Sequence, residues 1–264
     1  MKNIFLLIIG ISALAVACQS IKKRKADAIR VNPTTSTAKV ATQAERILAK
    51  TIAAHGGTLY ETAHYQFTFR DKKYTFKNEN GQYYYSVKSE KEGQVIFDKL
   101  DNTGFQRTVN GQTINLTPKD ISKYETALNS VIYFATLPHK LQDEAVNVEY
   151  VGMNTIKNQT YQVLKVYFNE AGGGKDHDDE FRYWINQSTN RIDYLAYNYH
   201  VNEGGVRFRS AYNPRVVEGI LFQDYVNYKA PYGTPLSELP AIFEKGDLKK
   251  LSVIETEEVI RKSY

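Results

Sequence analysis

The stretch "HYQFTFRDKKYTFKNENGQYYYSVKSE" (residues 64–90) decides the fold class. Short segments rich in aromatic and β-branched residues alternate in it with turn-forming residues, "DK" at 71–72 and "NENG" at 78–81. Segments of this kind, separated by short polar turns, are typical of antiparallel hairpins. The same pattern continues to residue 116 and resumes at residue 145. We therefore predict a long antiparallel meander.

Three helices are predicted around this meander. "TQAE" (42–45) is a capping-box pattern that opens a helix, and "GG" (56–57) ends it. A second helix is expected over 117–134, with a threonine as its N-cap and a proline as its first residue. A third, short helix is expected near 236–245, in a segment flanked by prolines.

One meander with helices gathered on one face predicts an α+β, mostly β fold over residues 41–264. We expect a single domain, a large curved antiparallel sheet in the form of an unclosed barrel, with a few helices packed on its concave side. The strands are predicted at 64–70, 73–77, 81–90, 94–99, 104–109, 112–116, 145–151, 160–169, 179–186, 191–201, 206–212 and 215–229, with a last one at 249–259.

Residues 1–17 have the features of a signal peptide. Lys2 precedes an apolar run over 4–16, which is shorter than the roughly 20 apolar residues that span a membrane. Cys18 follows small residues and is the only cysteine, so a disulfide within the chain is excluded. This arrangement resembles the lipobox of bacterial lipoproteins. The resemblance implies cleavage before Cys18, its modification with lipid such as palmitate, and attachment to a membrane.

The basic character of the chain is confined to its N-terminal end. Of 34 basic and 29 acidic residues, seven and two lie within 1–45, and the remaining 27 of each sign balance. Residues 18–40 lack a sustained periodicity and are predicted to be a basic, flexible tether. Its "KKRK" (22–25) either lies near anionic lipid head groups or is a solvated linker. Because the folded part has no net charge, nucleic acid is not an expected partner.

A histidine flanked by acids in "GGGKDHDDEFRYW" (172–184) raises the question of a site. If 187–190 and 202–205 are four-residue hairpin loops, the strand registers can be derived, and opposed residues share a face. His177, His200 and Arg207 then form one row across three strands, and Asp179, Asn198 and Arg209 form the next.

The same registers place aromatic and apolar side chains further along that face. A slip of one residue in either hairpin would move a whole strand's side chains to the opposite face, so the arrangement depends on both loop lengths. The expected face continues with Phe181, Tyr183, Ile185, Ala196, Tyr194 and Ile192, while Trp184, Leu195 and Tyr197 share the other face.

The polar row admits several chemistries. His177 and His200 with a carboxylate of Asp176, Asp178 or Asp179 have ligand types that suit Zn, Mn or Fe, although their spacing matches no standard metal motif. We therefore assign no metal and no cofactor.

An acid–base role is a second interpretation of the row. A histidine beside a carboxylate can act as a general base, while Arg207 and Arg209 hold a carboxylate or phosphate group. No short hydrolase or phosphate-loop motif is present. In the third interpretation these charges only pair with one another in water. Against it, His200, Arg207 and Arg209 are expected within strands, where an unpaired charge is costly to bury.

Two resemblances support a carrier-like fold. Tyr161-x-Val163-x-Lys165-x-Tyr167 and the later "YWINQSTNRI" (183–192) resemble a strand pair of the LolA/LolB lipoprotein-carrier fold, which implies an unclosed barrel with helices as a lid over an apolar cavity. "AHGG" (54–57), "DHDDEFRYWI" (176–185), "YNYHVNEGGVRFRSAYNPRVV" (197–217) and "GILFQDYVNYKAP" (219–231) are similar to a family of uncharacterised lipoproteins from Bacteroidota.

His55 belongs to the apolar stripe of the first helix. It is expected either to be a helix-end residue near the negative end of the dipole or to line the mouth of the cavity. Gln19, next to the lipidated cysteine, is compatible with delivery to the outer membrane. We expect a protein anchored by lipid in the bacterial cell envelope, on the periplasmic side or the outer surface, with the outer membrane favoured.

We expect a binding protein rather than an enzyme. An apolar or amphipathic ligand, such as a lipid, would lie in the half-barrel cavity, with its polar head at Arg207, Arg209, His200 and His177 and its tail against Phe181, Tyr183 and Tyr194. The alternatives are a metal-assisted or acid–base hydrolase of the cell envelope that uses the His177, His200 and Arg207 cluster, and a surface scaffold that binds a protein.

Overall fold

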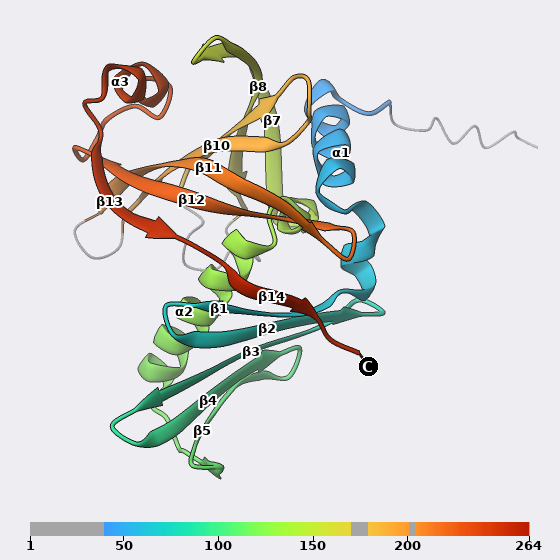
Figure 1. Ribbon diagram of the computed structural model, residues 1–264, viewed down its shortest axis with the longest axis vertical. Helices are drawn as coiled ribbons and strands as arrows, with labels where there is room; N and C mark the ends of the chain where they lie inside the picture. The colour runs from blue at the N-terminus through green and yellow to red at the C-terminus, as the bar shows by residue number, and fades with distance from the viewer. Residues whose placement is uncertain (1–39, 170–178, 201–203, 264) are drawn as a thin grey trace, which may run out of the picture. The chain divides into compact units, whose positions relative to one another are not determined.

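Two antiparallel sheets of seven strands each form the framework of the computed structural model, which describes residues 40–169, 179–200 and 204–263 (Figure 1). Residues Ala41–Tyr264 group as one compact unit. Within the described residues neither sheet closes on itself, because each ends in strands that are paired on one side only. The mostly β, unclosed fold class with a few helices is confirmed.

The first sheet has the order β14-β1-β2-β3-β4-β5-β6. Its strands alternate between buried and more exposed side chains, as expected for a sheet with one face in the core. Tyr65 and Phe67 of β1 are buried, and so are Tyr74 and Phe76 of β2. Its strands are β1 (His64–Phe69), β2 (Lys72–Glu79), β3 (Gln82–Lys91), β4 (Gln94–Asp101), β5 (Gly104–Val109), β6 (Gln112–Thr113) and β14 (Glu257–Arg261).

The second sheet has the order β13-β12-β11-β10-β9-β8-β7. β7 forms one edge, and a bulge between Tyr150 and Gly152 interrupts its pairing with β8. Its strands are β7 (Val146–Ile156), β8 (Gln159–Phe168), β9 (Phe181–Asn186), β10 (Ile192–Tyr199), β11 (Gly205–Val217), β12 (Ile220–Ala230) and β13 (Lys249–Ile254).

Two strand predictions in the C-terminal part were wrong. The segment 249–259 forms two strands, β13 and β14, one in each sheet. The expected break at 213–214 is only a bulge in β11, and the chain turns instead at Glu218 and Gly219, where both residues have positive φ. A bulge keeps a strand continuous although it contains turn-forming residues, which explains the error.

The capping patterns predicted the two long helices well. In α1 (Gln43–His55) Thr42 and Glu45 form a reciprocal capping box, and Gly56 ends the helix at φ 133°. In α2 (Pro118–Ala135) the Thr117 side chain accepts a hydrogen bond from the backbone of Asp120. The third helix, α3, is shorter than expected and covers Leu239–Lys245. No helix of the described residues is long and apolar enough to cross a membrane.

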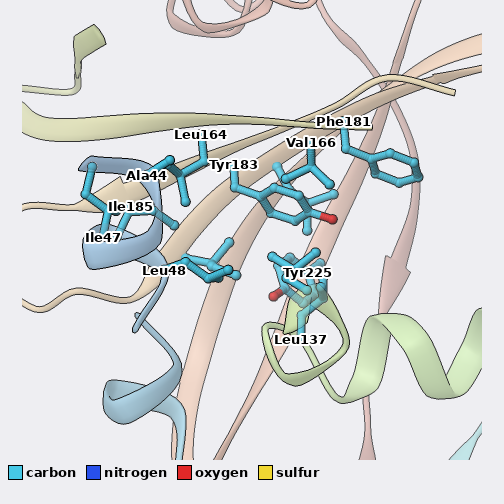
Figure 2. Packing of buried hydrophobic residues seen from close by; sticks show 13 residues of the cluster. Ala44, Ile47, Leu48, Leu137, Leu164, Val166, Phe181, Tyr183, Ile185 and Tyr225 are labelled. Atoms are coloured by element: carbon cyan, nitrogen blue, oxygen red, sulfur yellow. The ribbon is translucent and has the colours of Figure 1, made fainter. Parts of the chain in front are cut away.

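Three buried clusters hold these elements together. In the first, α1, Leu137 and the strands β8 and β9 meet around Tyr183 and Tyr225 (Figure 2). The second joins the first sheet to α2, with Phe67 and Ile132 fully buried. The third packs α3 against the opposite face of the second sheet. The second sheet is therefore covered on both faces.

His55 is a buried, neutral member of this interior. Its side chain is 1% exposed, and its Nδ1 lies 2.8 Å from the carbonyl oxygen of Thr51. Burial, aided by the positive charge of Arg191, lowers the pKa of His55 to about 4 although the hydrogen bond to Thr51 opposes the shift. At neutral pH the imidazole therefore carries no charge that could interact with the helix dipole.

We predict that His55 makes stability depend on pH. Its folded pKa lies below its unfolded value, so the unfolded chain takes up the proton first as pH falls. The contribution is complete above about pH 6.5 and is lost toward pH 4, on the order of 2 kcal/mol at pH 4.5. Urea unfolding at pH 7.5 and 4.5 should show a smaller loss for His55→Asn than for the unchanged protein.

Two half-buried histidines, His64 and His139, serve as an internal control. Burial also lowers the pKa of His64 and of His139, but both residues are present in the unchanged protein and in His55→Asn. The difference between the two proteins therefore isolates His55. An identical change in the free energy of unfolding between the two pH values would contradict the prediction.

Candidate functional site

The hairpin of β9 and β10 begins in the predicted register and then leaves it. The Asn186 amide donates to the carbonyl of Arg191 at 2.9 Å, and Ile192 is opposed to Ile185, as expected. A bulge at Asp193 then shifts the register by one residue, so that Tyr183 is opposed to Leu195 instead of Tyr194.

The bulge has an identifiable cause in side-chain hydrogen bonding. The carboxylate of Asp193 accepts hydrogen bonds from Tyr161 Oη at 3.2 Å and from Asn186 Nδ2 at 2.9 Å. These partners hold Asp193 on their own side of the sheet, so the extra residue is accommodated within β10. Loop length alone could not indicate this.

The hairpin of β10 and β11 differs more strongly from the prediction. β10 ends at Tyr199, which is opposed to Gly205, so His200 belongs to the connection and is not opposed to Arg207. Arg207 is opposed to Tyr197, and Arg209 to Leu195. The connection is thus longer than the four residues assumed, and the two predicted rows do not form.

Both shifts are odd numbers of residues, so the side chains of β10 after its bulge lie on the face opposite to the one predicted. Phe181, Tyr183 and Tyr197 share the inner face of the second sheet with Arg209. Tyr194 lies on the other face, where its ring stacks on Phe208 at 5.6 Å and helps to bury α3. The grouping of Trp184 with Leu195 and Tyr197 is wrong for the same reason, since Trp184 is opposed to Tyr194.

Part of the predicted cluster lies outside the described residues, namely Asp176, His177 and Asp178, as does Cys18. Asp179 is buried, and its Oδ1 lies 3.4 Å from His200 Nδ1. No group of three His, Cys, Asp or Glu side chains within the described ranges is arranged to hold a metal ion.

A polar pocket lies on the α3 side of the second sheet and contains two of the predicted residues. Asn198 and His200 line this space of about 300 Å³ together with Glu180, Arg182 and the segment 232–236. Glu180 is already paired, with Lys165 at 3.4 Å and Arg182 at 3.1 Å. Asn198 Oδ1 accepts a hydrogen bond from the backbone N–H of Glu180 at 2.7 Å. Glu180, Lys165 and Arg182 therefore form a group of ion pairs that has a structural role at the end of the sheet.

A second cavity, the inter-sheet cavity, lies between the two sheets and α2. Its volume is about 210 Å³, and both sheets and the helix contribute to its wall. Apolar and aromatic side chains dominate the lining. The lining residues are Phe67, Phe69, Arg70, Ser130, Val131, Phe134, Ala135, Arg209, Gln223, Tyr225, Asn227, Ile254 and Thr256.

Arg209 is the predicted site residue that lines this cavity. It is 7% exposed, its Cζ lies 3.8 Å from the ring centroid of Phe134, and its Nη2 donates to Tyr197 Oη at 2.9 Å. A guanidinium stacked on an aromatic ring retains a favourable interaction when it is removed from water. The sheet and the helix therefore hold this charge in place at the cavity wall.

Three further predicted residues, Tyr183, Arg207 and His55, are not in the wall of the cavity. Tyr183 Oη is 3.0 Å from Tyr133 Oη, and burial keeps the Tyr183 pKa well above its usual value. Arg207 stacks on Tyr199 and hydrogen-bonds to the hydroxyl of that tyrosine. His55, buried at the C-terminal end of α1, is not among the lining residues.

Sequence reasoning missed most of the cavity wall. Phe67 and Phe69 were identified only as strand residues, and Phe134 only as the end of a helix. One signal was available in "FQDYVNYK" (222–229), where Gln223, Tyr225 and Asn227 recur at every second position, as expected for one face of a strand. The sequence does not indicate that this face of β12 packs opposite β1 and α2, because that arrangement depends on segments distant in the sequence.

Similarity to solved structures concerns the fold. A LolA superfamily protein from Nitrosomonas europaea superposes with a TM-score of 0.51 at 14% identity, over 85% of this chain and 96% of that chain. A DUF1329 family protein from Desulfovibrio piger gives a TM-score of 0.44 at 8% identity, over 84% and 94%. The first similarity shows a LolA-like fold, as the resemblance in the strand pair implied.

Sequence comparison identifies the family. No curated protein matches the sequence. Residues 35–256 match the model of DUF6503, which is described as a family of unknown function. This match spans most of the folded part, including α1, every strand except β14, and the inter-sheet cavity. The chain therefore belongs to the DUF6503 family.

Proposed function

We propose that this protein binds an apolar or amphipathic molecule in the inter-sheet cavity. The observation that carries the proposal is the cavity itself, walled by Phe67 and Phe69 of β1, Phe134 of α2 and Tyr225 of β12. Ligand sites are generally concave and mostly apolar, with a few polar groups that orient the ligand. The wall combines side chains of this kind from three separate elements.

The chemistry of the wall favours binding over catalysis. The acid–base hypothesis depended on a row of His177, His200 and Arg207, and β10 and β11 do not bring His200 opposite Arg207. Among the residues that the structure describes, no histidine, cysteine or carboxylate side chain lines the inter-sheet cavity. Proton transfer in catalysis most often uses a histidine or a carboxylate, and a serine or threonine nucleophile needs such a base beside it.

We also propose that the protein is a lipoprotein of the bacterial cell envelope, of the kind found in Bacteroidota. The support is the sequence of the leader, with its apolar segment and the single cysteine, Cys18, after small residues. The basic tether would then place the folded part near a membrane surface. A binding protein in that position would have access to lipids and to other poorly soluble molecules.

Filling the cavity should abolish binding. We expect an uncharged apolar fluorophore, N-phenylnaphthylamine, to bind the full chain with an increase in its fluorescence. Ala135→Trp places an indole in the space lined by Ala135 and should weaken this binding at least about tenfold, since a filled site cannot take up the probe. Fluorescence titration measures the change.

The matched control is Ala127→Trp, two turns earlier on α2. Ala127 is exposed and does not line the cavity, so its replacement should change the dissociation constant less than about twofold. Equal affinity of the Ala135→Trp and Ala127→Trp proteins would reject the inter-sheet cavity as the binding site.

The membrane anchor predicts a second, independent outcome. Cys18→Ala removes the sulfur that would carry the lipid, so radiolabelled palmitate should no longer be incorporated and the protein should move from the membrane to the soluble fraction. Labelling and fractionation of cells that produce each form measure both effects. Membrane association and labelling that persist in Cys18→Ala would refute the anchor.

A further inference from the structure

The inter-sheet cavity has a polar end that the proposed function leaves unexplained. Arg209 of β11 and Asn227 of β12 are directly opposed, so their Cβ atoms lie about 5 Å apart, and both residues line the cavity. Arg209 Nε and Asn227 Oδ1 are buried, and neither atom has a hydrogen-bond partner within the described part of the chain. Two unpaired polar atoms on directly opposed residues point to a missing partner.

The arginine offers a free donor because its other contacts are of a different kind. Its Nη2 donates to Tyr197 Oη and the flat side of the guanidinium faces Phe134. These contacts fix the orientation of the group and leave the Nε hydrogen unused. A buried cation with an unused donor is stabilised most strongly by an anionic acceptor.

The asparagine can present either of its amide atoms. Its Nδ2 lies 3.3 Å from Ser252 Oγ, and a serine hydroxyl can donate as well as accept. When the amide is turned over, the hydroxyl donates to Oδ1, and Nδ2 takes the unpaired position. The amide can then donate to the same ligand group as Arg209.

The charges in the wall select an anion. Arg70 and Arg209 both line the cavity, and no Asp or Glu of the described ranges does. Asp224, a buried acid on the same strand as Asn227, is engaged by Arg215 at 3.1 Å and by the Thr256 amide at 3.0 Å. The positive charge of Arg209 is therefore available to a ligand.

Charge distinguishes between anions. Arg209 is a buried cation of the wall, whereas Arg70 is exposed, and one buried positive charge matches the single negative charge of a carboxylate better than the charge of up to two on a phosphate. We propose that the cavity takes an alkyl carboxylate of medium chain length, with Arg209 and Asn227 on the carboxylate and the aromatic wall around the chain. This inference rests on the proposed binding function and names the class of its ligand.

Three ligands with one tail test the head group. Decanoate, decanol and decyl phosphate are titrated into the full chain by isothermal calorimetry. We expect decanoate to bind at least about tenfold more tightly than decanol, because only decanoate gains charge-assisted hydrogen bonds. Decyl phosphate should bind more weakly than decanoate.

Substitutions in the cavity wall test whether Arg209 and Asn227 cause the preference for decanoate. In Arg209→Met, which keeps a long flexible side chain, decanoate should lose at least about tenfold in affinity, while decanol changes less than about twofold. The unchanged decanol affinity reports an intact cavity. Asn227→Leu should reduce the preference for decanoate in the same direction. Arg207→Met, two residues away on β11 and outside the lining, should keep it.

Each possible result has one meaning. Equal binding of decanoate and decanol, or a preference for decanoate that survives in Arg209→Met, overturns the head-group assignment while ligand binding stands. Tightest binding of decyl phosphate overturns the choice of carboxylate. Absence of binding for all three ligands contradicts the proposed function itself.

Discussion

The two sheets depend on a buried carboxylate at the place where the chain passes from one sheet to the other. Asp224 is 2% exposed and accepts hydrogen bonds from the Thr256 amide and from Asn213, with Arg215 close by. Thr256 lies between β13 and β14, which belong to different sheets. Because a buried charge is tolerated only with such partners, Asp224 holds Thr256 at the point where the chain crosses between the sheets. The inter-sheet cavity lies between the sheets joined at this crossing.

Local chemistry made much of the fold predictable, and non-local chemistry accounts for the errors. The boundaries of α1 and α2 followed from caps that involve residues three apart, Thr42 with Glu45 and Thr117 with Asp120. The register of β10 depended on Asp193, whose partners Tyr161 and Asn186 come from two other strands. The last strand was predicted as one because nothing within 249–259 indicates that its halves join different sheets.

The candidate site shows the same division. Arg209 was identified because a charge within a strand needs a partner, and that reasoning does not depend on register. Its expected neighbours, Asn198 and Asp179, were wrong because they followed from the assumed loop lengths. Its actual neighbours, Phe134 and Asn227, come from a helix and from the next strand. A single sequence indicates which residue types are unusual for their position, but the residues that surround them depend on tertiary packing.

The bulge in β7 affects how copies of the protein behave in solution. Among the described strands β7 pairs only with β8, so its outer edge carries backbone groups that another chain could pair with. Val151 and Met153 on this strand are exposed, which makes the edge apolar as well. Gly152, at φ 115°, breaks the regular spacing of these groups at the centre of the strand. A straight second strand cannot pair along the whole of this interrupted edge, which works against edge-to-edge pairing there.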